Sequence, residues 1–82
     1  MMWITDAKKA KGTYEILIKF NDGKNAMVNL KNCIENDHRP IIRELLDENM
    51  FNTFTVANDT VCWKNGADFA PEFLYKVGTI LN

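Results

Sequence analysis

The sequence predicts a small α+β domain with an antiparallel sheet, in the element order β-β-β-α-β-β-α and with two helices packed on one face of the sheet. Apolar and polar residues alternate on both sides of an Asp-Gly pair, which is typical of a hairpin. Two segments that begin with proline carry apolar residues at helical spacing. A chain of 82 residues is long enough for one modest core, so we expect residues 1–82 to form a single domain.

The first three strands are expected near the N-terminus. Residues 2–5 (MWIT) form a short apolar strand, and residues 13–20 (TYEILIKF) alternate strictly. Asp22-Gly23 predicts a primed turn with positive φ, after which residues 25–30 (NAMVNL) return. The residues expected to face the core are Tyr14, Ile16, Ile18, Phe20, Ala26, Val28 and Leu30.

The middle of the chain predicts a loop and then a helix. Residues 31–39 (KNCIENDHR) are mostly polar, and Pro40 suits the first turn of a helix because its φ is fixed and it lacks an N–H. Residues 40–49 (PIIRELLDEN) form one short amphipathic helix laid on the sheet. Its apolar stripe consists of Ile41, Ile42, Leu45 and Leu46.

A second hairpin and a last helix complete the expected fold. TFTVAN, residues 53–58, and TVCW, residues 60–63, pair around an Asn58-Asp59 turn. The last helix begins at Pro71. Its apolar stripe is expected to contain Phe73, Leu74, Val77, Ile80 and Leu81.

The composition excludes several classes of protein. Ten basic and eleven acidic side chains give a formal net charge of −1, so no long-range field draws the protein to nucleic acid or to anionic lipid. No apolar run approaches the roughly 18–20 residues that cross a bilayer, and an acid and two lysines occupy the place of a signal peptide's apolar region. We therefore expect a cytoplasmic protein without membrane association.

The inventory of reactive side chains is small. There is no serine, which excludes a Ser-His-Asp triad, and His38 is the one histidine. A Cys-His pair would have to unite His38 with Cys33 or Cys62, and no third orienting group is in view. Because the spacing matches neither a zinc site nor a disulfide framework, we expect reduced thiols, no metal and no cofactor.

The densest cluster of distinctive residues is WKNGADFAPEFLY, Trp63 to Tyr75. We expect Gly66 to turn the chain with positive φ, Asp68 to accept N–H bonds at the N-terminus of the last helix, and Pro71 to begin that helix. Phe73 and Leu74 would return to the core. The signature residues of this segment are Trp63, Asn65, Gly66, Asp68, Pro71, Glu72, Phe73 and Tyr75.

The same segment has a catalytic alternative. Asp68 would be a general base or metal ligand, Asn65 an oxyanion donor, and Trp63 and Tyr75 the walls. Such a site needs a reacting partner and a second group to hold the base, and neither is visible. We therefore expect the segment to serve the fold, with a binding surface as the remaining alternative.

Two surface features are candidates for interaction. Leu17 and Met27 lie on the outer face of the first hairpin and would form one apolar spot for a partner or a second copy, unless they are isolated surface residues. Lys8, Lys9 and Lys11 are expected in a solvated turn, with a weak nucleic-acid contact as the alternative.

His38 and Arg39 form a third surface candidate. They precede a helix start and could bind an anion, although an exposed histidine is the simpler interpretation.

The chain resembles a known family. VCWKNGADFAPEFLY, residues 61–75, is similar to the C-terminal signature of the small, mostly bacterial domain-of-unknown-function family 2442, and YEILIKFNDGKNAMVNL, residues 14–30, resembles that family's first hairpin. Asn29 stands where the family usually has Asp. Ala70 stands where a polar or acidic cap is common, which implies a helix cap weaker by about 0.5–2 kcal/mol.

The resemblance implies a single α+β domain of unassigned activity. Members sometimes carry a helix-turn-helix extension, for which these 82 residues leave no room, so direct operator binding is not expected. Many are encoded beside another small protein, in arrangements resembling toxin–antitoxin pairs. This implies a non-enzymatic interaction or regulatory module, antitoxin-like or an adaptor, whose partner is the neighbouring gene product or a second copy. The alternative is a small ligand-binding domain or enzyme that uses Asp68, Asn65 and His38.

Overall fold

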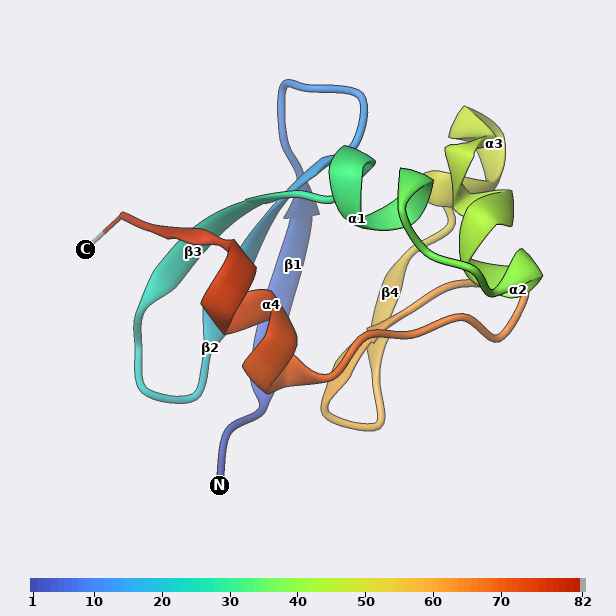
Figure 1. The fold of residues 1–82 in the computed structure, drawn as a ribbon. Helices are drawn as coiled ribbons and strands as arrows, with labels where there is room; N and C mark the ends of the chain where they lie inside the picture. The colour runs from blue at the N-terminus through green and yellow to red at the C-terminus, as the bar shows by residue number, and fades with distance from the viewer. Residues whose placement is uncertain (82) are drawn as a thin grey trace.

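A four-stranded antiparallel sheet is the larger of two sheets in the computed structural model, which describes residues 1–81 (Figure 1). The strands lie in the order β1-β2-β3-β6. Their bounds are β1 Ile4–Lys9, β2 Glu15–Phe20, β3 Asn25–Asn29 and β6 Thr79–Ile80.

A separate two-stranded sheet and several short helices complete the domain. The second sheet pairs β4 (Thr55–Ala57) with β5 (Thr60–Cys62). The helical segments are α1 Lys31–Glu35, α2 Pro40–Arg43, the 3₁₀ turn η1 Glu44–Leu46, α3 Glu48–Phe51 and α4 Pro71–Val77. The predicted α+β class is confirmed, but four short helices take the place of the two that were expected.

The first hairpin has the predicted strands and the predicted inward face. Leu17 pairs with Met27 and Ile18 with Ala26, and all of Ile16, Ile18, Ala26 and Val28 are buried. The turn is of a different kind, because only Gly23 in it has a positive φ, of 86°. The primed turn lies in the second hairpin, where Asn58 and Asp59 have φ values of 53° and 68°.

The first strand is longer than the MWIT segment that was expected, and it starts later. Lys8 and Lys9, expected in a turn, pair with Leu17 and Ile16 as part of β1, while Lys11 lies in the bend that follows. The register shifts between Ile4 and Asp6, which marks a β-bulge. The bulge moves the inward positions by one residue and so interrupts the alternation that predicts a strand.

Residues 31–39, expected to form a loop, include the short helix α1. Ile34 is buried in the core, and the carboxamide Oδ1 of Asn29 accepts a hydrogen bond from the backbone N–H of Lys31 at 3.0 Å. An asparagine at position 29 therefore still organises the start of this segment.

The single helix expected over 40–49 is broken in two. Asp47 has extended backbone angles (φ −69°, ψ 117°), and its carboxylate accepts a hydrogen bond from the N–H of Asn49 at 2.9 Å. An aspartate that bonds to nearby backbone in this way competes with helix continuation and favours a new helix start. Ile42 and Leu45 are buried as expected, whereas Ile41 is exposed.

The last helix begins at Pro71 as predicted but ends at Val77. Ile80 and Leu81, expected on its apolar stripe, lie beyond it, since Ile80 belongs to β6 and pairs with Ala26 of β3. A Cβ on Gly78 would lie 2.9 Å from Cγ2 of Val28. Only glycine therefore lets the chain pass this close to the sheet and return as a strand.

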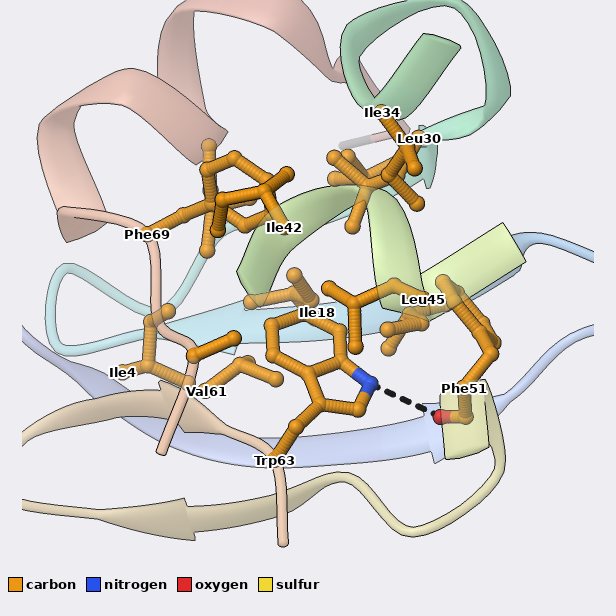
Figure 2. Close-up of a cluster of buried hydrophobic side chains, with 14 of the residues drawn as sticks. Ile4, Ile18, Leu30, Ile34, Ile42, Leu45, Phe51, Val61, Trp63 and Phe69 are labelled. Atoms are coloured by element: carbon orange, nitrogen blue, oxygen red, sulfur yellow. Dashed lines mark hydrogen bonds between the residues drawn. The ribbon is translucent and has the colours of Figure 1, made fainter. Parts of the chain in front are cut away.

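The centre of the core is an indole ring held by a buried hydrogen bond. Trp63, which directly follows β5, is 4% exposed, and its Nε1–H donates to the carbonyl oxygen of Phe51 at 2.8 Å (Figure 2). The ring of Phe69 meets Trp63 edge-on, with centroids 5.8 Å apart. The end of β5, the end of α3 and the segment around Phe69 therefore all meet at the side chain of Trp63.

Replacing Trp63 with phenylalanine should destabilise the protein by at least about 1–3 kcal/mol, because the buried carbonyl of Phe51 loses its donor. Urea unfolding followed by circular dichroism measures the change. Trp3→Phe is the matched control, since Trp3 is 40% exposed, and it should change the free energy of unfolding by less than about 0.5 kcal/mol. Equal effects of the two substitutions would contradict this role of Trp63.

Candidate functional site

The Asn-Gly segment after β5 forms the expected tight turn. The backbone N–H of Gly66 donates to the carbonyl of Trp63 at 3.0 Å, and the N–H of Trp63 donates to the carbonyl of Ala67 at 2.9 Å. Gly66 has a φ of 92°, which glycine adopts at little cost. This turn sends the chain back along β5, where Asp68 forms an isolated bridge with Cys62.

The side chain of Asn65 ties this turn to the helical segment. Its Nδ2 donates to the carbonyl of Ile41 at 3.0 Å and to Oε1 of Glu44 at 2.7 Å, and its Oδ1 accepts from the N–H of Ala67 at 3.0 Å. Both amide hydrogens are therefore engaged. Asn65 serves as a structural clamp in this conformation, which leaves no donor for a substrate oxyanion.

Asp68 does not cap the last helix. The N-cap residue of α4 is Ala70, and no side chain caps this helix. Ala67 and Phe69 are buried while Asp68 between them is exposed, which is the alternation of an extended segment. The carboxylate therefore points outward, and the predicted capping bond is absent.

A cavity of about 460 Å³ lies beside Asp68. One part of its wall comes from α1 and the loop that follows it, and the other part comes from the extended segment and the start of α4. The lining residues are Cys33, Asp37, Arg39, Asp68, Phe69, Ala70 and Phe73.

The guanidinium group in this cavity is already paired. Arg39 donates from Nε to Oδ1 of Asp37 at 3.0 Å and from Nη2 to Oδ2 at 2.8 Å, which is a bidentate ion pair. The hydrogen bonds from Arg39 lower the pKa of Asp37 to about 2. His38 is exposed beside this pair and does not line the cavity, so the anion site suggested for His38 and Arg39 lacks a free guanidinium.

An aromatic pair forms the apolar wall. Phe69 is buried, and the ring of Phe73 stacks on it with centroids 5.4 Å apart and an interplanar angle of 17°. Phe73 is 37% exposed, so it extends the core to the surface instead of returning fully to it as expected.

The two thiols near this corner are poor nucleophiles. Burial raises the pKa of the Cys33 thiol, and the charge of Asp37 raises it further. Burial and the charge of Asp68 likewise raise the pKa of Cys62. Because the thiolate is the reactive form, this environment opposes nucleophilic chemistry.

Tyr75 and Glu72 lie apart from the cavity wall. The hydroxyl of Tyr75 donates to Oδ2 of Asp22 at 3.3 Å, and its ring meets Phe20 edge-on with centroids 4.9 Å apart. Burial and the charge of Asp22 raise the pKa of Tyr75. Glu72 is exposed in the first turn of α4. The proposed wall of Trp63 and Tyr75 around Asp68 is therefore not assembled.

The other surface candidates lie on the four-stranded sheet. Leu17 and Met27 are direct neighbours in the ladder, as expected, and both are half-buried. Lys8 pairs with Leu17, whereas the ammonium of Lys9 donates to the carbonyl of Gly12 in the following turn.

The described residues contain neither a grouped set of metal ligands nor a membrane-spanning helix. Among residues 1–81, no three His, Cys, Asp or Glu side chains are grouped so that they could hold a metal ion. No helix in the same range has the length and apolar character required to span a membrane.

Of the cavity lining, the sequence singled out Asp68 and Phe73, considered Cys33 and Arg39 only for other sites, and missed Asp37 and Phe69. The signal of Asp37 was an oppositely charged residue two positions away in a polar loop, which by itself is common. Only the folded chain brings this loop to the start of α4.

Fold and site together define a small α+β domain that carries a cavity walled by two phenylalanines and an ion pair. A family model described as a protein of unknown function (DUF2442) matches residues 9–79, and the chain belongs to this family. The resemblance noted in the C-terminal signature and in the first hairpin is thereby confirmed. No curated protein and no solved structure matches the chain.

Asn65→Ala should lower the free energy of unfolding by about 1–2 kcal/mol, because it removes three hydrogen bonds and leaves the carbonyl of Ile41 without this donor. Asp68→Asn should change it by less than about 0.5 kcal/mol, since the exposed carboxylate makes no capping bond. Chemical unfolding of both variants checks this order. If Asp68→Asn lowered the free energy of unfolding more than Asn65→Ala does, Asp68 would cap the helix after all.

The ion pair of Asp37 and Arg39 should give a defined acid dependence. The folded pKa of about 2 lies below the ordinary value of about 3.9, so the pair stabilises the fold above about pH 4 and loses this effect as the pH falls toward 2. The stability difference between wild type and Asp37→Asn should be constant from pH 7 to 5 and shrink below pH 4.

Carbon-detected NMR titration checks the assignment of this effect. The Asp37 carboxyl should titrate near pH 2 in the wild type and move toward about 3.9 in Arg39→Gln. A wild-type midpoint near 3.9 would show that the pair does not form in solution.

Proposed function

We propose that this chain is a non-enzymatic interaction module of the bacterial cytoplasm, the antitoxin-like or adaptor partner of a neighbouring gene product. The observation that carries the proposal is the placement of exposed apolar side chains. Eight large apolar residues are exposed in the described part of the chain, and four of them fall within residues 73–81. These four are Phe73, Val77, Ile80 and Leu81.

The C-terminal segment carries these side chains within residues 73–81. Phe73 and Val77 are four residues apart in α4, so they lie one above the other on the same face of the helix. Ile80 follows in β6, at the edge of the four-stranded sheet. We name Phe73, Val77, Ile80 and Leu81 the C-terminal apolar strip. Grouped exposed apolar surface of this kind is typical of a protein-binding site.

The state of the polar residues also favours binding over catalysis. Asn65 is engaged as a clamp, and the pKa values of both thiols are raised. Among residues 1–81, Asp68 belongs to no group of three side chains that could hold a metal ion. This pattern supports a module that recognises a partner.

A small ligand-binding domain is the second candidate function. The cavity of about 460 Å³ falls in the range of small-molecule pockets, and Asp68 contributes a charged group to it. We rank it second because the C-terminal apolar strip is then left without a role.

Val77→Asp should weaken the complex with the neighbouring gene product at least about tenfold, because it places a charge in an apolar contact. Val56→Asp is the matched control, since Val56 in β4 is 38% exposed and Val77 is 39% exposed. Co-expression and co-purification, followed by calorimetry, measure both variants.

Three outcomes would count against the proposal. Absence of any complex with the wild-type chain would remove the partner-binding role. Equal weakening by Val56→Asp would remove the C-terminal apolar strip as the contact. Loss of a homodimer instead of a heteromeric complex, measured by light scattering, would assign the strip to a second copy.

A further inference from the structure

The charges around the cavity do not balance. Asp37 and Asp68 carry two negative charges, and Arg39 carries one positive charge that both oxygens of Asp37 already bind. Asp68 is near enough to raise the pKa of Arg39, but its side chain forms no hydrogen bond or ion pair within residues 1–81. The charges of the cavity lining therefore sum to −1, which favours a positively charged guest.

The aromatic wall adds a preference for the shape of that guest. Phe69 is buried and packs edge-on against Trp63, so the Phe73 ring rests on a fixed support. A planar cation can stack on the face of a phenyl ring, and a guanidinium stacks better than an ammonium because it is flat and less strongly hydrated. A guanidinium can also bind a carboxylate through two parallel hydrogen bonds.

We propose that this cavity receives an arginine side chain of a partner polypeptide, with Asp68 as its counter-ion and Phe73 as its stacking surface. The inference rests on the proposed function. A polypeptide suits the site better than a free cation does, because Phe73 belongs both to the cavity and to the C-terminal apolar strip. A chain that places its arginine in the cavity can continue along α4 over Val77.

The pairing of Arg39 with Asp37 helps the cavity to accept a positively charged guest. Because Asp37 neutralises Arg39, the guest meets the attraction of Asp68 with little net repulsion from the resident guanidinium. The Cys33 thiol in the wall stays protonated, since burial and Asp37 raise its pKa, and so adds no charge.

The first test uses a peptide probe, acetyl-Gly-Arg-Gly-amide, titrated into ¹⁵N-labelled protein. Saturable shifts should appear at the amides of residues 68–73, except Pro71, with a dissociation constant of about 1 mM. The same peptide with citrulline, which is neutral and nearly identical in shape, should produce none. Asp68→Asn should weaken binding at least about fivefold, while Asp6→Asn, the same charge change on exposed β1, should leave it unchanged.

Equal shifts with the citrulline peptide, or equal binding by Asp68→Asn, would overturn the inference. Both variants should melt within a few degrees of wild type, because neither carboxylate is buried. If Asp68→Asn then shows no shifts with the arginine peptide, the cause is the missing charge and not unfolding.

The second test uses the neighbouring gene product and separates this inference from the function on which it rests. Asp68→Asn should weaken that complex at least about tenfold relative to Asp6→Asn. If the wild-type complex forms and Asp68→Asn binds equally well, the arginine pocket is wrong and the interaction module stands. If the wild-type chain does not bind the neighbouring gene product, both the proposed function and the binding of a partner's arginine are wrong.

Discussion

The hydrogen bond from the Trp63 indole to the carbonyl of Phe51 connects parts of the chain that have no strand pairing in common. An indole N–H buried in a core needs an acceptor, and losing one costs about 1–3 kcal/mol, so the end of α3 has one favourable position relative to β5. Two residues later, Asn65 binds the carbonyl of Ile41 and thereby positions α2. The broken helical segment and the small hairpin are thus held as one unit. Phe69 in the wall of the cavity packs against Trp63 and is therefore fixed relative to the same unit.

Much of the sheet could be predicted because its signals are local. The alternation from Ile16 to Phe20 and the Asp-Gly turn specify the first hairpin without help from the rest of the chain. The missed features depend on interactions that a pattern does not contain. A bulge in β1 shifts the alternation of inward and outward residues by one position. The carboxylate of Asp47 ends a helix that the neighbouring residues would have continued. β6 can form only because Gly78 can approach Val28.

One wall of the candidate site was predictable in part from the sequence, but the geometry of the site was not. WKNGADFAPEFLY drew notice for good reason, yet most of its members support the fold: Gly66 turns the chain, Asn65 clamps it and Trp63 fills the core. The inference of a capped helix failed because Ala67 and Phe69 both turn inward, which sends Asp68 outward. The opposite wall comes from a loop some thirty residues earlier, and such a juxtaposition is a property of tertiary structure.

The two-residue strand β6 also decides how the sheet ends. A bare edge strand exposes unpaired N–H and C=O groups that can recruit another chain, and β3, with the sequence NAMVN, carries neither proline nor charge to prevent this. β6 covers part of that edge through Ala26 and Met27, and the N–H of Leu81 donates to the carbonyl of Asn25. At the opposite edge, β1 has a bulge, two lysines and a bond from Ile4 to Asp59. Both borders of the sheet thus carry features that oppose the addition of a further strand, while α4 presents its exposed apolar side chains away from the strand ladder.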